Sequence, residues 1–225
     1  MRFDLPTWIR HLRHVAGPLP GPATPLSAGD LEVAVRTSLL EAGPREHAGR
    51  APAGVAGAAG ELALWWARAD PSVDVDAVLA AADPAARPPD VGPAASDGSL
   101  LPRDRYRAIE VWTDADLAAM HALWWLARDR GRPDWAARLD EVRSWHLANT
   151  QPDNATNRPW AIHVFLLAGS PEDEHYAQTL LHNALAIDAE PTPLGRVLLH
   201  DAADALERTL AGDDAGAAAS GHDGA

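Results

Sequence analysis

The feature that most constrains this chain is the helical spacing of its apolar residues. Leu117, Met120, His121 and Trp124 recur at positions i, i+3, i+4 and i+7, which is one face of a 3.6-residue repeat. No segment offers the run of alternating β-branched residues that is typical of a strand. We therefore predict an all-α protein, with helices over 30–41, 61–69, 73–82, 113–130, 133–146, 160–167, 171–188 and 193–210.

An internal echo predicts how these helices are arranged. ALWWARAD at 63–70 is followed 59 residues later by ALWWLARD at 122–129, and a turn and a second helix are expected after each. This favours antiparallel αα-hairpins packed as a bundle, either α/α-toroid-like or as a helical-repeat array. A chance match in an Ala-rich chain is the alternative. The tryptophans are interpreted as core residues, and a tryptophan-lined carbohydrate groove is the second interpretation.

Domain limits follow from the Pro- and Gly-rich stretches. We expect one domain over 1–210, with irregular loops near 43–60 and 84–104 and a disordered acidic tail over 211–225. Within it, Thr113 is predicted to be an N-cap, with Asp116 in a capping-box-like position three residues later.

Composition excludes several classes of function. The net charge is -13, which argues against nucleic acid and anionic membranes as partners. The chain has no cysteine, so thiolate chemistry is excluded, and all 19 cationic residues are arginine, so a catalytic lysine is excluded as well. We see neither a signal peptide nor an apolar run of about 18 residues, and expect a cytoplasmic protein.

The most suggestive segment is NTQPDNATNRPWAIHVF at 149–165, where a polar loop runs directly into an apolar helix. Asn157 is predicted to cap that helix, with Pro159 in its first turn. The loop can be read as a turn that closes the fold, or as one wall of a pocket in which Arg158 at a helix N-terminus binds an anion. The candidate ligand-binding residues on the second interpretation are Asp153, Asn154, Asn157, Arg158, His146 and His163.

The C-terminal segment resembles a known family. HYAQTLLHNALAIDAEPTPLGRVLLHDAADAL, from residue 175, is similar to the HD-domain phosphohydrolases, in which a histidine precedes a His-Asp doublet. The resemblance implies a divalent metal held by His175, His200 and Asp201 that activates water against a phosphate ester. Ala202-Ala203 stands where the family has Ile-Gly, and Asp204 or Asp213 would have to supply the last ligand.

Two functions are therefore carried forward from the sequence. The preferred one is a helical binding or scaffold protein without a cofactor, which takes a small anionic ligand or a protein partner at a polar pocket near 151–163. The alternative is a metal-dependent hydrolase that uses histidine and aspartate residues from the C-terminal helices. A purely structural subunit with a tryptophan-rich interface is a third hypothesis. Neither Gly-x-Ser-x-Gly nor His-Glu-x-x-His occurs, so whether the protein is an enzyme stays open.

Overall fold

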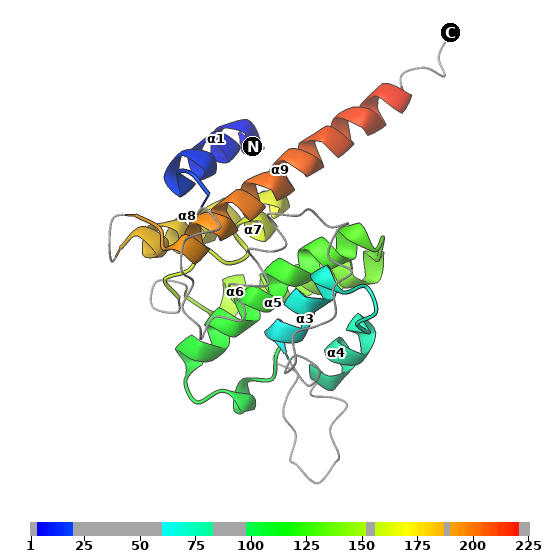
Figure 1. Ribbon diagram of the computed structural model, residues 1–225, viewed down its shortest axis with the longest axis vertical. Helices are drawn as coiled ribbons and strands as arrows, with labels where there is room; N and C mark the ends of the chain where they lie inside the picture. The colour runs from blue at the N-terminus through cyan, green and yellow to red at the C-terminus, as the bar shows by residue number, and fades with distance from the viewer. Residues whose placement is uncertain (1–3, 20–59, 83–97, 152–155, 187–189, 221–225) are drawn as a thin grey trace.

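A computed structural model describes residues 4–19, 60–82, 98–151, 156–186 and 190–220 of the chain, and within these ranges it is all-helical (Figure 1). The helices are α1 (Leu5–Ala16), α3 (Glu61–Ala69), α4 (Val75–Ala82), α5 (Ile109–Asp129), α6 (Pro133–Asn149), α7 (Ile162–Ala168), α8 (Pro171–Leu185) and α9 (Pro193–Ser220), with a short 3-10 helix, η2, at Arg103–Arg105. The all-α prediction is confirmed. The helix expected at 30–41, the loop at 43–59 and residues 84–97 lie outside the described residues.

Helix α5 is the centre of the bundle. It packs against α3, α6 and α7, while α7 also contacts α8 and α9. Its side chains are buried on nearly every face, including Leu117, Met120 and Leu123. A helix that is apolar all round must lie inside a protein, because no face remains for water. The polar residues Asp116 and His121 in the middle of α5 are consequently in the interior too, and they build the sites described below.

The two halves of the sequence echo lie on α3 and α5, which pack against each other. Each is followed by a second helix, so that α3–α4 and α5–α6 form the expected hairpins. The hairpins differ in length, since α3 has 9 residues and α5 has 21. Trp65 is buried whereas Trp124, its counterpart in the echo, is partly exposed. The echoed tryptophans therefore occupy different environments.

Helix α1 lies alongside α9, which projects beyond the rest of the molecule towards the C-terminus (Figure 1). Arg13 of α1 pairs with Asp204 and Glu207 of α9. The last helix was expected to end near Leu210, but it continues to Ser220, and residues 221–225 lie outside the described part. Among the described residues, no helix combines the length and the apolar character needed to cross a bilayer.

Several helix ends differ from the prediction. Helix α5 begins at Ile109, four residues before Thr113, so the prediction of Thr113 as its N-cap is wrong. Thr113 instead donates to the carbonyl of Ile109 within the helix, at 2.9 Å. Helix α8 has the capping box that α5 lacks, because Ser170 and Asp173 each accept from the other's backbone N–H.

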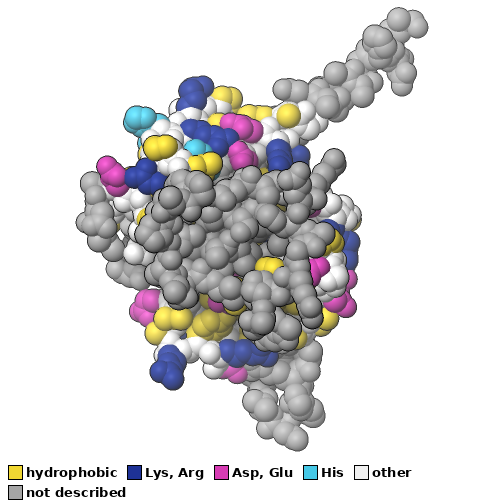
Figure 2. Space-filling view, in the orientation of Figure 1, with side chains coloured by type: hydrophobic (Ala, Val, Ile, Leu, Met, Phe, Trp, Pro, Cys, Tyr) yellow, Lys and Arg dark blue, Asp and Glu magenta, His cyan; other side chains and the backbone are white. Residues whose placement is uncertain are grey.

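Figure 2 shows acidic and basic side chains interspersed on one face of the molecule.

Candidate functional site

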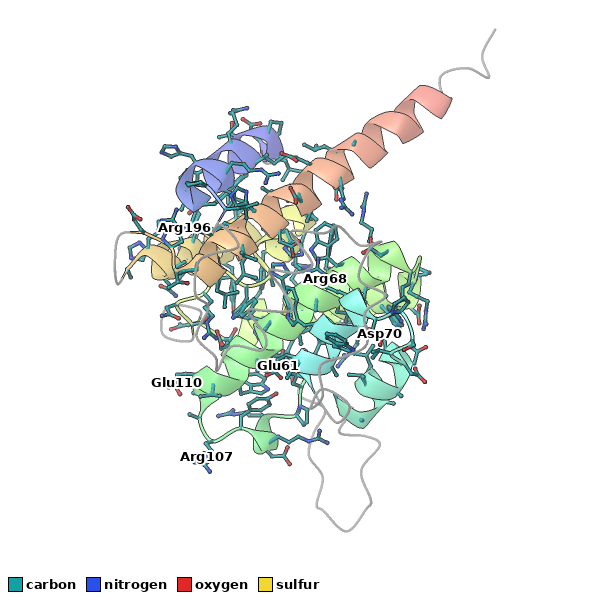
Figure 3. The ribbon with its side chains drawn as sticks, in the orientation of Figure 1. Glu61, Arg68, Asp70, Arg107, Glu110 and Arg196 are labelled. Carbon is teal, nitrogen blue, oxygen red and sulfur yellow. The ribbon has the colours of Figure 1, made fainter. Side chains whose placement is uncertain are left out.

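A charged cluster lies in the interior where α3, α5 and α9 meet. Arg68 of α3, which is labelled in Figure 3, donates to both carboxylate oxygens of Asp201 of α9, at 2.8 and 3.2 Å. His121 of α5 places its Nε2 2.8 Å from the same carboxylate. Burial by itself would raise the pKa of Asp201, but the positive charge of Arg68 and the hydrogen bond from His121 lower that pKa well below its ordinary value. Asp201 is thus held as a buried carboxylate.

The backbone fixes the tautomer of His121. The N–H of Ala161 donates to Nδ1 of His121 at 3.1 Å, so Nδ1 is the acceptor and the ring proton is on Nε2, facing Asp201. Ala161 has φ 51°, the left-handed region that side chains with a Cβ rarely adopt. The turn into α7 is therefore tied to α5 and α9 through one imidazole.

His163 lies next to this cluster and has no comparable partners. It is completely buried, and neither ring nitrogen is within hydrogen-bond distance of a described atom. Its ring stands edge-on to His121, with 4.4 Å between the ring centroids, and edge-on to Trp124 at 4.9 Å. Burial lowers the pKa of His163 well below 6.5, and His121 lowers it further. His163 is therefore a neutral imidazole whose donor and acceptor are both unused.

A second buried cluster lies one to two turns earlier on α5. Asp116 accepts from the backbone N–H of Leu101 at 2.6 Å, and its other oxygen is 2.7 Å from Nε2 of His146. Nδ1 of His146 lies 3.0 Å from Thr150 Oγ1, which in turn is 2.7 Å from the hydroxyl of Tyr176. The chain of contacts joins α5, α6 and α8. Because His146 and Asp116 are both fully buried, this cluster holds helices together and presents nothing to a ligand.

The polar loop before α7 closes the fold. Asp114 of α5 accepts from Thr156 Oγ1, from the Arg158 guanidinium at 2.9 Å and from Trp160 Nε1 at 2.8 Å. Helix α7 begins at Ile162 with no side-chain cap, so the predictions that Asn157 caps it and that Pro159 is in its first turn are wrong. Asn157 is exposed, and Arg158 pairs with a carboxylate instead of standing free at a helix N-terminus. The sequence alone could not show that Asp114 would occupy the place of an anion.

The candidate ligand-binding residues are consequently not gathered in one pocket. Asp153 and Asn154 lie outside the described residues. His146 packs against Trp112 and His163 against Trp124, three turns apart on α5, where one turn rises about 5.4 Å. Both histidines are inaccessible from the loop, since each is completely buried. The geometry supports the interpretation of this loop as a turn that closes the fold.

The residues of the HD-like segment are also separated by their contacts. His175 is exposed on α8. His200 is 2.8 Å from the carbonyl of Gly17 and 2.8 Å from a guanidinium nitrogen of Arg13, whereas Asp201 faces Arg68 and His121. Over the described ranges, no three His, Asp or Glu side chains are placed together in the manner of a metal site. The structure therefore does not bring His175, His200 and Asp201 into one ligand set.

An open cleft of about 520 Å³ lies on the outer side of α5, between the start of α6 and α7. Its apolar wall is formed by Trp124, Leu139, Val164 and Leu167, together with alanine side chains. Its charged residues are Arg128, Arg132, Arg143 and Asp140. A cleft of this size falls within the range that small-molecule sites occupy. It brings apolar and charged side chains of three helices together around one open volume.

Sequence reasoning missed the residues of this cleft, because they come from three separate helices. Arg128, Arg132 and Arg143 lie within 16 positions, but they look like ordinary surface residues of two successive helices. Their convergence depends on the turn at Gly131, which has φ 60° and reverses the chain between α5 and α6. A signal for the buried clusters did exist, since His121 interrupts an apolar stripe. Nothing in the sequence paired it with Asp201, 80 residues away, which had been singled out only as part of the HD-like segment.

Comparison with protein-family models, with curated proteins and with solved structures finds no match to this chain.

Proposed function

We propose that this protein binds a small, largely apolar anion in the cleft between α5, α6 and α7. The proposal keeps the binding function that the sequence favoured and moves its site from the loop at 151–158 to the cleft. The single observation that carries it is the combination of an apolar wall with three arginines and one carboxylate around an open volume of about 520 Å³. With a net charge of -13 the molecule as a whole repels anions, so an arginine of the cleft that is not paired with a described carboxylate is a local exception. A cytoplasmic location belongs to the same proposal.

The apolar wall supplies the affinity in this proposal. Leu139 and Val164 form its base and are buried, while Trp124 and Leu167 are partly exposed along its sides. Apolar area removed from water contributes about 25 cal/mol per Å², so a ligand that covers the indole of Trp124 gains from burial. Aromatic and aliphatic walls with a few polar groups are typical of small-molecule sites.

Among the arginines, Arg128 is the one available to a ligand. Arg132 is already paired with Asp76 and Asp134, and Arg143 with Asp140 and Asp173. Arg128 is exposed and donates to the carbonyl of Arg208 at 2.9 Å, and no described carboxylate lies within ion-pair distance of it. A guanidinium with free donors beside an apolar wall is suited to a carboxylate, which it can hold with two parallel hydrogen bonds.

The test is a titration with 8-anilinonaphthalene-1-sulfonate, an aromatic anion that fluoresces on entering an apolar site, followed by calorimetric titration with dodecanoate. We expect both to bind the wild-type protein with one site. Arg128→Gln should weaken binding about tenfold, the value of one charge-assisted hydrogen bond. Ala136→Trp, which places an indole from an exposed position into the cleft, should abolish binding.

The matched control is Arg107→Gln. Arg107 is also exposed, but it precedes α5 at the opposite end from the cleft (Figure 3). Its substitution removes the same charge and should leave both affinities unchanged. If the Arg107 and Arg128 variants weaken binding equally, the anion responds to overall charge and the cleft proposal is wrong. Unchanged circular dichroism at 222 nm in all three variants shows that the fold is intact.

A further inference from the structure

Three buried nitrogen atoms without hydrogen-bond partners belong to residues that adjoin Trp124 and Val164 of the cleft wall. They are Nδ1 and Nε2 of His163 and Nε1 of Trp125, and they are the buried side-chain polar atoms that lack a hydrogen bond within the described part of the chain. The two rings are 6.5 Å apart between centroids. Buried polar atoms in folded proteins are nearly always paired, so the two unpaired nitrogens of the His163 ring mark a place where a polar group from elsewhere can be received.

Trp124 separates these atoms from the cleft. Its indole forms part of the cleft wall, and its ring centroid is 4.9 Å from that of His163. Val164, the residue after His163, belongs to the same wall. Trp124 is partly exposed whereas His163 is completely buried, so the indole is the layer between the open volume and the imidazole.

The position of Trp124 is coupled to the arginine that would hold the anion. The guanidinium carbon of Arg128 lies 5.7 Å from the centroid of the Trp124 ring, within the range of a cation–π contact. A carboxylate bound to Arg128 competes for that guanidinium and loosens its contact with the indole. The indole is partly exposed and borders the open volume of the cleft, so its rotation into that volume would uncover the imidazole behind it.

We infer that the ligand of the cleft carries, besides its anionic end, a neutral hydroxyl group that reaches His163 once Trp124 turns aside. This inference rests on the cleft being the binding site proposed above. A hydroxyl both donates and accepts, so it can satisfy either free nitrogen of a neutral imidazole. A second carboxylate would not fit, because Asp201 already places a negative charge near His163 and a further buried charge would be desolvated. The ligand class is an apolar hydroxy acid.

The experiment compares matched pairs of ligands on the full chain. Straight-chain carboxylates of 6–12 carbons (the range set by the cleft of about 520 Å³) and their ω-hydroxy derivatives are titrated by calorimetry. At one chain length the hydroxy acid should bind about tenfold more tightly than its parent, the effect of pairing a buried group that is otherwise unpaired. In His163→Phe, which keeps the ring and removes both nitrogens, the advantage should disappear while the parent acid still binds.

A second measurement does not depend on the fold of the variant. In wild-type protein labelled with ¹⁵N at histidine, the ring nitrogen resonances of His163 should shift further with the hydroxy acid than with the parent acid, because only the hydroxyl forms a hydrogen bond to the ring. If both acids bind equally and shift those resonances by the same amount, the inference is wrong and the cleft function stands. If no acid of either series binds, the proposed function fails and the inference fails with it.

Discussion

Replacing Asp201 by asparagine tests the central claim that one buried carboxylate holds three helices together. Asp201 accepts two hydrogen bonds from Arg68 and one from His121, and the Arg68 and Asp201 side chains are 11% and 6% exposed. Asparagine has one acceptor oxygen and turns an NH₂ group towards donors. It therefore leaves the guanidinium of Arg68 buried without a counter-charge.

The expected cost follows from that burial. Removing one partner of a buried ion pair destabilises proteins by about 3–5 kcal/mol, a large part of the roughly 5–15 kcal/mol by which a domain is stable. Asp204→Asn is the matched control on the same helix, one turn later, where the carboxylate pairs with Arg13 and is 38% exposed. Its removal should cost less than about 1 kcal/mol, as for surface pairs.

Urea unfolding at pH 7, followed by circular dichroism at 222 nm, gives both free energies of unfolding. The double variant Arg68→Met/Asp201→Asn should be more stable than Asp201→Asn alone, because no unpaired charge remains in the interior. A loss for Asp201→Asn no larger than that for Asp204→Asn would refute the reasoning, since Arg68 would then be hydrated and the cluster would not be buried in solution.

Two further predictions concern pH and helix capping. Because the pKa of His163 is lowered below 6.5 in the fold, the unfolded chain binds a proton that the folded chain does not, and the free energy of unfolding should fall by up to about 1.4 kcal/mol per pH unit below pH 6.5. His121, Asp201 and Arg68 face this imidazole, and the stability that the lowered pKa of Asp201 contributes is lost only at more acidic pH, below about 4. Unfolding curves at pH 7, 6 and 5 therefore lie above that range, and the difference between the wild-type slope and the flatter slope expected for His163→Phe gives the contribution of His163. Ser170→Ala should cost about 1 kcal/mol by thermal unfolding because it removes the cap of α8, whereas Asn157→Ala should cost less than about 0.5 kcal/mol; equal losses would restore Asn157 as a cap.

Helix positions were predictable where local signals were strong and unopposed. The prediction of a helix over 61–69 matches α3, and Pro133 and Pro171 open α6 and α8 as expected, because proline is tolerated only at the start of a helix. Thr113 was misassigned because a threonine inside a helix cannot be distinguished by sequence from a threonine that caps its N-terminus. Tertiary contact decided the start of α5, where Trp112 donates to the carbonyl of Leu101 at 2.8 Å.

The candidate site was less predictable, because polar partners are chosen by packing. The sequence marked His146 and His163 as unusual, and both are completely buried, but it gave no means of telling that one would face Asp116 and the other no described partner. One of the two interpretations of the loop placed Arg158 in an anion site, although Asp114 of α5 already pairs with it.

The amino-acid sequence by itself determined that this chain is helical, since a 3.6-residue apolar period is a local property of neighbouring residues. It also determined which chemistries lack a side chain to perform them, since no cysteine or lysine is present. Only the tertiary structure decided which imidazole is paired and where a cleft opens. The hydrogen bonds between Arg68 and Asp201 span 133 positions, and no local pattern specifies a contact that forms only when distant helices bury the same surface.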